Sequence, residues 1–205
     1  MTSASLASTS LTTLLEQFRS SAPTPGGGSA AALAGALGAS LFVMVASLPK
    51  PRAETDDERA TLKDVAEDCT SHARRLEALI DRDSVAYDQV VAAYRLPKQT
   101  DAEKSTRSEA IQSAMRAAID TPLEVMRACA AAMAHVATLH ALANPNASSD
   151  VQVGLELLGA GLRGARANVD INLGSIKDET YVETVRTEVA ALSESGGTDV
   201  PSASA

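Results

Sequence analysis

Apolar positions recur along most of the chain at the three- and four-residue spacing of amphipathic helices. The pattern is longest between about Glu54 and Tyr94, where two rows of residues, each with a period of seven, lie four positions apart. The rows are Leu62, Cys69, Leu76, Asp83 and Val90, and Ala66, Ala73, Ile80, Tyr87 and Tyr94. A seam of this kind predicts a helix that runs the length of a helical bundle.

The rest of the chain predicts further helices, separated by breaks rich in proline, glycine and asparagine. They cover Leu11 to Ser21, Ala30 to Pro49, Thr100 to Ala143, Val151 to Ile176, and a last helix capped by Asp178 and ending near Leu192. Thr100 and Glu103 form a capping box, and Thr121-Pro122 predicts a break or kink. The fold class expected is all-α, a bundle of long antiparallel helices. Residues 1–193 form one domain, and 194–205 form a disordered tail.

Composition argues against several kinds of partner, ligand and location. The formal net charge of −8 argues against a nucleic-acid partner. Cys69 and Cys129 stand without further cysteines, and the three histidines form no metal motif, so we expect no metal site and a reducing, cytoplasmic location. The N-terminus lacks the pattern of a signal peptide. The uncharged stretch from Ser20 to Pro49 is long enough to span a membrane, but its Ala, Gly and Ser content favours a buried central helix.

Asp83 is the most informative single residue, because it interrupts an apolar stripe. On a helix, Ile80, Tyr87 and Tyr94 all lie within about 60° of it, whereas Asp81 points nearly the opposite way. A buried carboxylate is costly unless it is paired. It therefore serves either as a salt bridge or cap within the core, or as an acid/base with a raised pKa that faces a pocket.

Two glycine patterns suggest a ligand or close packing. Pro25, Gly26, Gly27, Gly28 and Ser29 precede the apolar helix, where backbone N–H groups and the helix dipole favour an anion. The alternative is a flexible connector.

The helix after Asp150 carries a similar stripe, which consists of Asp150, Gly154, Gly161, Ala165, Asn168 and Asn172. Its asparagines can orient a polar substrate, or they can form hydrogen bonds across a tight helix interface. Lys98, in the proline-constrained turn after the long helix, has the best claim to a ligand among the basic residues near loops.

Together these segments resemble the formiminotransferase-cyclodeaminase/cyclohydrolase family over about Leu11 to Leu192. The resemblance rests on the combination of P-x-P-G-G-G-S, L-P-K-x-T and S-D-x-x-V-G, which begin at Pro23, Leu96 and Ser149. It implies a dimeric bundle of long helices that acts on a tetrahydrofolate derivative, with no tightly bound cofactor. The family's catalytic aspartate maps onto Asp83.

The resemblance favours hydrolysis of 5,10-methenyltetrahydrofolate to 10-formyltetrahydrofolate. Cyclodeamination of 5-formiminotetrahydrofolate and an inactive folate-binding dimer are the alternatives. In the first hypothesis, Asp83 takes a proton from water. The expected substrate-binding residues are Pro25, Gly26, Gly27, Gly28, Ser29, Lys98, Asn144, Asn146, Ser149, Asp150, Asn168 and Asn172.

Overall fold

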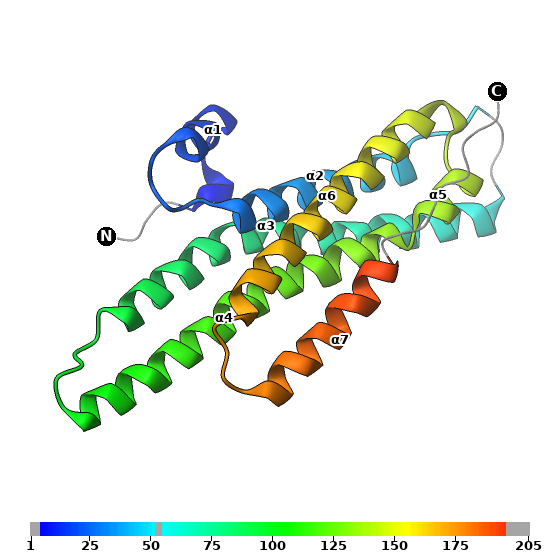
Figure 1. Ribbon diagram of the computed structural model, residues 1–205. Coiled ribbons are helices and arrows are strands. Elements are labelled where there is room, and N and C mark those ends of the chain that lie inside the picture. The colour runs from blue at the N-terminus through cyan, green and yellow to red at the C-terminus, as the bar shows by residue number, and fades with distance from the viewer. Residues whose placement is uncertain (1–4, 52–54, 196–205) are drawn as a thin grey trace.

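The protein is helical throughout the residues that its computed structural model describes, which are 5–51 and 55–195. Seven α-helices follow one another along these residues (Figure 1). They are α1 (Leu11–Arg19), α2 (Gly27–Ser47), α3 (Asp56–Tyr94), α4 (Asp101–Met133), α5 (Val136–Leu142), α6 (Ser148–Leu173) and α7 (Glu179–Ser195), with short 3₁₀ turns η1 (Leu6–Ser8) and η2 (Pro145–Ala147). The predicted all-α class is therefore confirmed.

Four long helices form the core and lie at the corners of a square in the order α2, α3, α4, α6. Each packs against its two neighbours in this order, and α2 runs antiparallel to both α3 and α6. The close approach of α2 and α6 depends on glycine. A Cβ on Gly38 would lie 2.6 Å from the carbonyl oxygen of Gly154, and a Cβ on Gly161 would lie 2.8 Å from that of Ala31. The glycine stripe of α6 therefore serves helix packing.

The core seam of α3 is as predicted only in its first half. Leu62, Cys69 and Leu76 are buried, but Tyr87 and Tyr94 are 41% and 49% exposed. Beyond Asp83, the buried residues of α3 are instead Ala86 and Ala93. The reason is that α2 begins alongside Asp83, so within residues 5–51 and 55–195 no helix covers this face of α3 beyond that point.

Pro122 does not break or end α4, so of the break or kink predicted from Thr121-Pro122 the break is wrong. The helix continues from Asp101 to Met133, and the Thr121 hydroxyl donates to the Ala117 carbonyl instead of capping a new helix. Proline has no N–H to donate to the carbonyl four residues earlier, which is that of Ala118. The side-chain amide of Asn172 in α6 donates to this carbonyl at 3.1 Å. A tertiary contact thus replaces the lost helical hydrogen bond.

The remaining helix ends agree with the predictions to within a few residues, with two exceptions. The helix expected to reach Ala143 ends at Met133, and α5 follows after two turn residues. The last helix is capped by the Asp178 carboxylate as predicted. However, it extends to Ser195, so the first two residues of the predicted disordered tail are helical. Residues 196–205 lie outside the described part of the chain.

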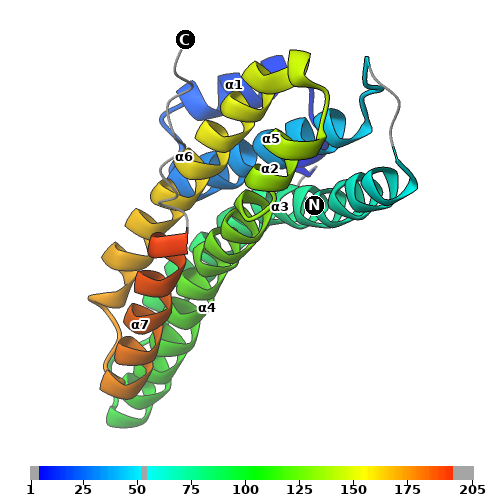
Figure 2. The ribbon, with the colours of Figure 1, turned by 90° about the vertical axis from the view of Figure 1, so that its right-hand side faces the viewer.

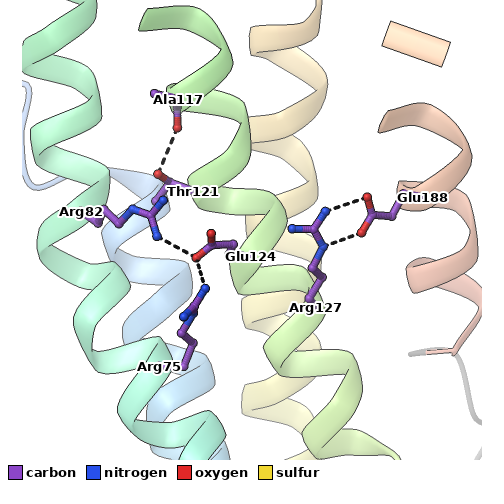
Figure 3. A network of polar contacts seen from close by, with 7 residues as sticks. All are labelled: Arg75, Arg82, Ala117, Thr121, Glu124, Arg127 and Glu188. Atoms are coloured by element: carbon purple, nitrogen blue, oxygen red, sulfur yellow. Dashed lines mark hydrogen bonds and ion pairs between the residues drawn. The ribbon is translucent and has the colours of Figure 1, made fainter. Parts of the chain in front are cut away.

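Helix α7 lies beside α4 and α6 on the outside of the bundle, as both ribbon views show (Figures 1 and 2). Arg127 of α4 makes two hydrogen bonds to the carboxylate of Glu188 (Figure 3). One turn earlier on α4, Glu124 accepts hydrogen bonds from Arg75 and Arg82 of α3. Ion pairs therefore connect α4 to a neighbour on either side.

Two helical stretches among the described residues are long and apolar enough to cross a membrane by length and composition. They are α2 and the segment from Asp101 to Leu142, and half of the most apolar window of each is buried within the bundle.

Candidate active site

Asp83 lies on α3 at the point where α2 begins. Its Oδ2 accepts a hydrogen bond of 2.9 Å from the backbone N–H of Ser29, in the first turn of α2. The Ser29 hydroxyl is 3.1 Å from the same oxygen and 2.8 Å from the Ile80 carbonyl, and its one proton can serve only one of them at a time. Asp83, which lies on α3, thus caps the start of α2. A cap within the core is the structural role that its position in the sequence allowed.

This cap also explains why α2 begins at Gly27, three residues before the predicted start. The N-cap residue Gly26 has no side chain to accept a hydrogen bond from the first-turn N–H groups. Asp83 supplies the missing acceptor from a position 54 residues later in the chain. Local sequence contains no sign of this contact.

Gly28 makes room for the Asp83 carboxylate. A Cβ built on Gly28 would overlap Oδ1, and it would lie 2.5 Å from the carboxyl carbon. Any larger residue would therefore push the carboxylate away from Ser29. Gly28 belongs to the helix, so the three glycines are not simply a flexible connector.

Burial raises the pKa of the Asp83 carboxyl above its ordinary value, and the hydrogen bonds from the Ser29 hydroxyl and backbone lower it and offset part of this effect. The positive end of the α2 dipole also favours the ionised form. A half-buried carboxylate with a raised pKa is a better proton acceptor than an ordinary aspartate and can return the proton later.

Asn168 of α6 completes this cluster from the other side. A Cβ on Gly27 would lie 3.7 Å from its Nδ2, so its amide is adjacent to the exposed start of α2. Nδ2 donates to the Gly164 carbonyl, and Oδ1 has no donor among the described residues. Asn172, one turn further along, is engaged with Ala118. The cross-interface hydrogen bond considered for the asparagines therefore applies to Asn172.

The structure brings Gly26, Gly27, Gly28, Ser29 and Asn168 together with Asp83. Pro25 directly precedes them and is half-buried, with a cis peptide bond before it. Lys98 is exposed in the turn between α3 and α4 and lies farther along the bundle.

The other predicted binding residues lie at the opposite end of α2. The Asn144 amide donates to the carbonyl of Pro49 at 2.6 Å, and its Oδ1 accepts from the backbone N–H of Asn146. Ser149 and Asp150 are in the first turn of α6. From Ser149 to Asn168 the helix rises by roughly 28 Å. Within one chain, these four residues are therefore not part of the cluster around Asp83.

Two residues were not among the predicted site residues, one beside Asp83 and one in the cleft that Lys98 lines. Tyr87 is one turn after Asp83 on the same face of α3 and is exposed, although the seam predicted a core position. Lys177, in the segment after α6, lines the same cleft as Lys98. The spacing of Tyr87 from Asp83 is visible in the sequence, but the proximity of Lys177 to Lys98 is a tertiary fact. Over the described residues, no three His, Cys, Asp or Glu side chains are grouped to hold a metal ion.

The described residues thus form an all-α helical bundle with a half-buried carboxylate at a glycine-rich helix start. The chain belongs to the formiminotransferase-cyclodeaminase family, whose profile matches residues 10–191.

Relatives of known name extend this assignment. The chain is 38% identical to a protein named methenyltetrahydrofolate cyclohydrolase from Methylorubrum extorquens, over 90% of this chain and 89% of that one. It is 31% identical to rat formimidoyltransferase-cyclodeaminase, of which the match covers only 35%. It also resembles the crystal structure of formiminotetrahydrofolate cyclodeaminase from Thermotoga maritima, with a TM-score of 0.82 and 25% identity over 92% and 90% of the two chains.

Proposed function

We propose that this protein hydrolyses 5,10-methenyltetrahydrofolate to 10-formyltetrahydrofolate. The observation that carries the proposal is the Asp83 carboxylate, which is half-buried, has a raised pKa and sits at the exposed start of α2. The relative named methenyltetrahydrofolate cyclohydrolase, which aligns over about nine tenths of both chains, supports this choice among the family's reactions.

Hydrolysis of the methenyl bridge requires one group that acts first as a base and then as an acid. The bridging carbon of the substrate lies between two nitrogens in a cationic, electrophilic amidinium. Ionised Asp83 removes a proton from water while the water oxygen bonds to this carbon. The protonated carboxyl then donates to N5 as the carbon–N5 bond breaks, its electron pair goes to N5, and the adduct hydroxyl loses its proton to solvent. A formyl group remains on N10.

The neighbours of Asp83 suit this reaction. The negative carboxylate complements the positive charge of the substrate. Asn168 presents an uncommitted Oδ1 that can accept a hydrogen bond from the pterin or from the adduct hydroxyl. Ser29 holds the carboxylate through its backbone N–H, which fixes the base relative to α2.

Cyclodeamination is the second candidate, and the fold similarity to the Thermotoga cyclodeaminase favours it. In this reaction N10 of 5-formiminotetrahydrofolate attacks the formimino carbon, and the N10 proton passes to the formimino nitrogen. The carboxylic acid form of Asp83 then protonates the departing ammonia, and the methenyl bridge closes. The same residue serves both reactions, so its geometry alone does not separate them.

We further propose that the protein is a homodimer that works in the cytoplasm without a tightly bound cofactor and without a membrane. Support for an interface comes from apolar side chains left exposed on α1 and α2, among them Leu11, Leu37 and Met44. In a dimer, Asn144, Asn146, Ser149 and Asp150 can act on a substrate only from the second chain or at a second position, because each chain separates them from its own Asp83.

The test compares Asp83→Asn with Asp81→Asn. Asn keeps the acceptor for Ser29 but removes the base, so turnover of 5,10-methenyltetrahydrofolate is expected to fall about 10²–10⁴-fold. Asp81 lies two residues away and accepts from Ser5 and Leu6 instead, so its variant is expected to keep activity within about twofold. The measurement is the decay of methenyl absorbance, with circular dichroism to check the fold.

The same proteins should be incubated with 5-formiminotetrahydrofolate, and ammonia should be measured. Ammonia release by the wild type without methenyl hydrolysis would favour the deaminase. Binding of folate without turnover of either substrate would favour a non-catalytic helical dimer. Full activity of Asp83→Asn would exclude Asp83 as the base.

A further inference from the structure

A cleft of about 480 Å³ lies at the far end of the bundle from α5, between the end of α3, the start of α4 and the segment after α6. Four cations line it, Lys98, Lys104, Arg107 and Lys177, together with Tyr94 and Gln112. We call it the basic cleft. None of the acidic residues in the described part of the chain lines it, although the chain has 26 acids against 18 lysines and arginines. Such a concentration of one charge in an acidic protein suits a carboxylate-bearing ligand.

Specific contacts hold the cleft in shape. Gln112 of α4 donates from its amide to the Ser175 carbonyl at 3.0 Å and accepts from the Lys177 backbone N–H at 2.8 Å. The Arg107 guanidinium donates to the Tyr94 carbonyl and lies over the Tyr94 ring, 5.5 Å from its centre. The position of Lys177 is therefore set by its backbone, independently of its side chain.

The ammonium groups of the cleft remain largely available. Lys98 makes no hydrogen bond or ion pair with any described residue. The Lys177 ammonium donates to the neutral hydroxyl of Ser108 at 3.1 Å and has no carboxylate partner among the residues that the structure describes. Lys104 pairs with the highly exposed Asp101, an interaction that water weakens. Two cations in particular, Lys98 and Lys177, can therefore take up a negatively charged ligand without breaking an ion pair.

The basic cleft and Asp83 lie on the same face of α3, at different points along the helix. Tyr94 is eleven residues after Asp83, which places it within about 20° of the same direction and roughly 17 Å farther along the helix. Tyr87 stands between them, and this face is uncovered because α2 begins beside Asp83. Across from it, Asn168 and Asn172 share one face of α6, and Ser175, two residues after the end of that helix, lines the cleft. One face of α3 and one face of α6 thus both extend from the Asp83 carboxylate to the basic cleft.

We infer that the basic cleft binds the carboxylates of the substrate's glutamate end, while the exposed ring of Tyr87 supports the aromatic part between. This inference rests on the proposed function, because it assumes a folate at Asp83. A folate is elongated, with the reacting carbon next to the pterin and the carboxylates at the far end of a p-aminobenzoyl arm. Lys98 and Lys177 are the specific anchors.

The experiment measures kcat and KM with 5,10-methenyltetrahydrofolate and with 5,10-methenyltetrahydropteroate, which lacks the glutamate. The wild type should show a KM about tenfold lower for the folate. The double variant Lys98→Ala/Lys177→Ala should raise the KM for the folate to that for the pteroate, with kcat unchanged. Lys98→Arg/Lys177→Arg should preserve the preference. The control, Lys63→Ala, removes an exposed cation twenty residues before Asp83 and should change neither constant.

The outcomes separate this inference from the proposed function. A wild type that turns over both substrates with equal KM, or a double variant that keeps the preference, would overturn the role of the cleft and leave the reaction intact. If the wild type turns over neither, calorimetry with 5-formyltetrahydrofolate and 5-formyltetrahydropteroate decides instead. Loss of discrimination in the double variant would then support the cleft, and retained discrimination would overturn it.

Discussion

Helix α2 uses glycine in two ways, at its start and in its middle. At its start, the missing side chain of Gly28 admits a carboxylate from α3. In its middle, the missing side chains of Gly35 and Gly38 admit Cys129, Leu76 and the backbone of α6. The first region contains an ionisable group and half-exposed residues, whereas the second is dry and tightly packed.

The difference shows that a glycine in an apolar helix marks a place where another group comes close to the helix backbone. It does not show whether that contact serves a functional site or helix packing. The partner atom decides whether the approach serves chemistry or stability. At Gly28 the partner is the mobile end of a side chain, so a substitution should displace that side chain. At Gly38 the partner is the carbonyl oxygen of Gly154, which cannot move without shifting α6.

The largest effect that separates the two regions is expected from Gly28→Ala. The new methyl group occupies the position of the Asp83 carboxylate, which must then leave Ser29. A base displaced by about 1 Å loses on the order of a hundredfold in turnover. Thermal unfolding should change little by comparison, because the side chain of Asp83 can rotate. Turnover per folded molecule is the quantity to measure.

Its control is the same substitution in the Asp83→Asn background. If Gly28→Ala acts through Asp83, it should cause little further loss there, because effects on one functional unit are not additive. An undiminished hundredfold loss in the double variant would show that Gly28 acts on the substrate directly, and the distinction between mobile and fixed partners would fail at this position.

Gly38→Ala should have the opposite profile, a loss of stability with normal turnover per folded molecule. Its Cβ would meet the Gly154 carbonyl at 2.6 Å and the Leu158 side chain at 2.8 Å. Overpacking of this kind costs about 1–3 kcal/mol in the free energy of unfolding. For a chain of this size, that corresponds to a decrease in Tm of roughly 2–12 °C.

The matched control is Gly159→Ala, in the interior of α6. There the added methyl group would meet only the flexible end of Arg163, at 3.0 Å. Because alanine favours a helix more than glycine does, this variant should be neutral or more stable by up to about 1 kcal/mol. A Gly38→Ala protein as stable as Gly159→Ala would contradict the close packing of α2 on α6.

The sequence was sufficient for features that depend on local periodicity and capping. The long α3, the capping box at Thr100 and the Asp178 cap follow from residue spacing and are present as predicted. Asp83 was distinguished because it interrupts an apolar stripe. Its partner Ser29, however, is 54 residues away, so the true start of α2 was not predictable from the residues around it.

Features that depend on a missing or added neighbour were predicted wrongly. Tyr87 and Tyr94 fit an apolar seam, but α2 is too short to cover them. Thr121-Pro122 predicted a break or kink, but α4 is unbroken, and Asn172 satisfies the carbonyl that the proline leaves free. In both cases the deciding residue lies on another helix. The proximity of Lys98 and Lys177 escaped prediction for the same reason.

The smallest expected effect concerns stability and its dependence on pH at the start of α2. Because burial raises the pKa of Asp83 in the folded state, the folded protein binds this proton more tightly than the unfolded chain. Ionisation of Asp83 therefore destabilises the fold progressively as pH rises from the ordinary Asp pKa to the raised one, and the loss then stays constant.

The variant Asp83→Asn isolates this contribution, because its amide does not titrate but still accepts a hydrogen bond from Ser29. It should equal the wild type in stability at acidic pH, apart from a constant offset, and gain on it as pH approaches neutrality. Denaturant unfolding of both proteins from about pH 4 to pH 8 measures the difference, in which the other titrating groups cancel. A difference that shrinks as pH rises would mean that the Ser29 bonds and the α2 dipole outweigh burial. The start of α2 would then be more polar than its glycine-packed middle, but the ionised Asp83 there would stabilise the fold instead of destabilising it.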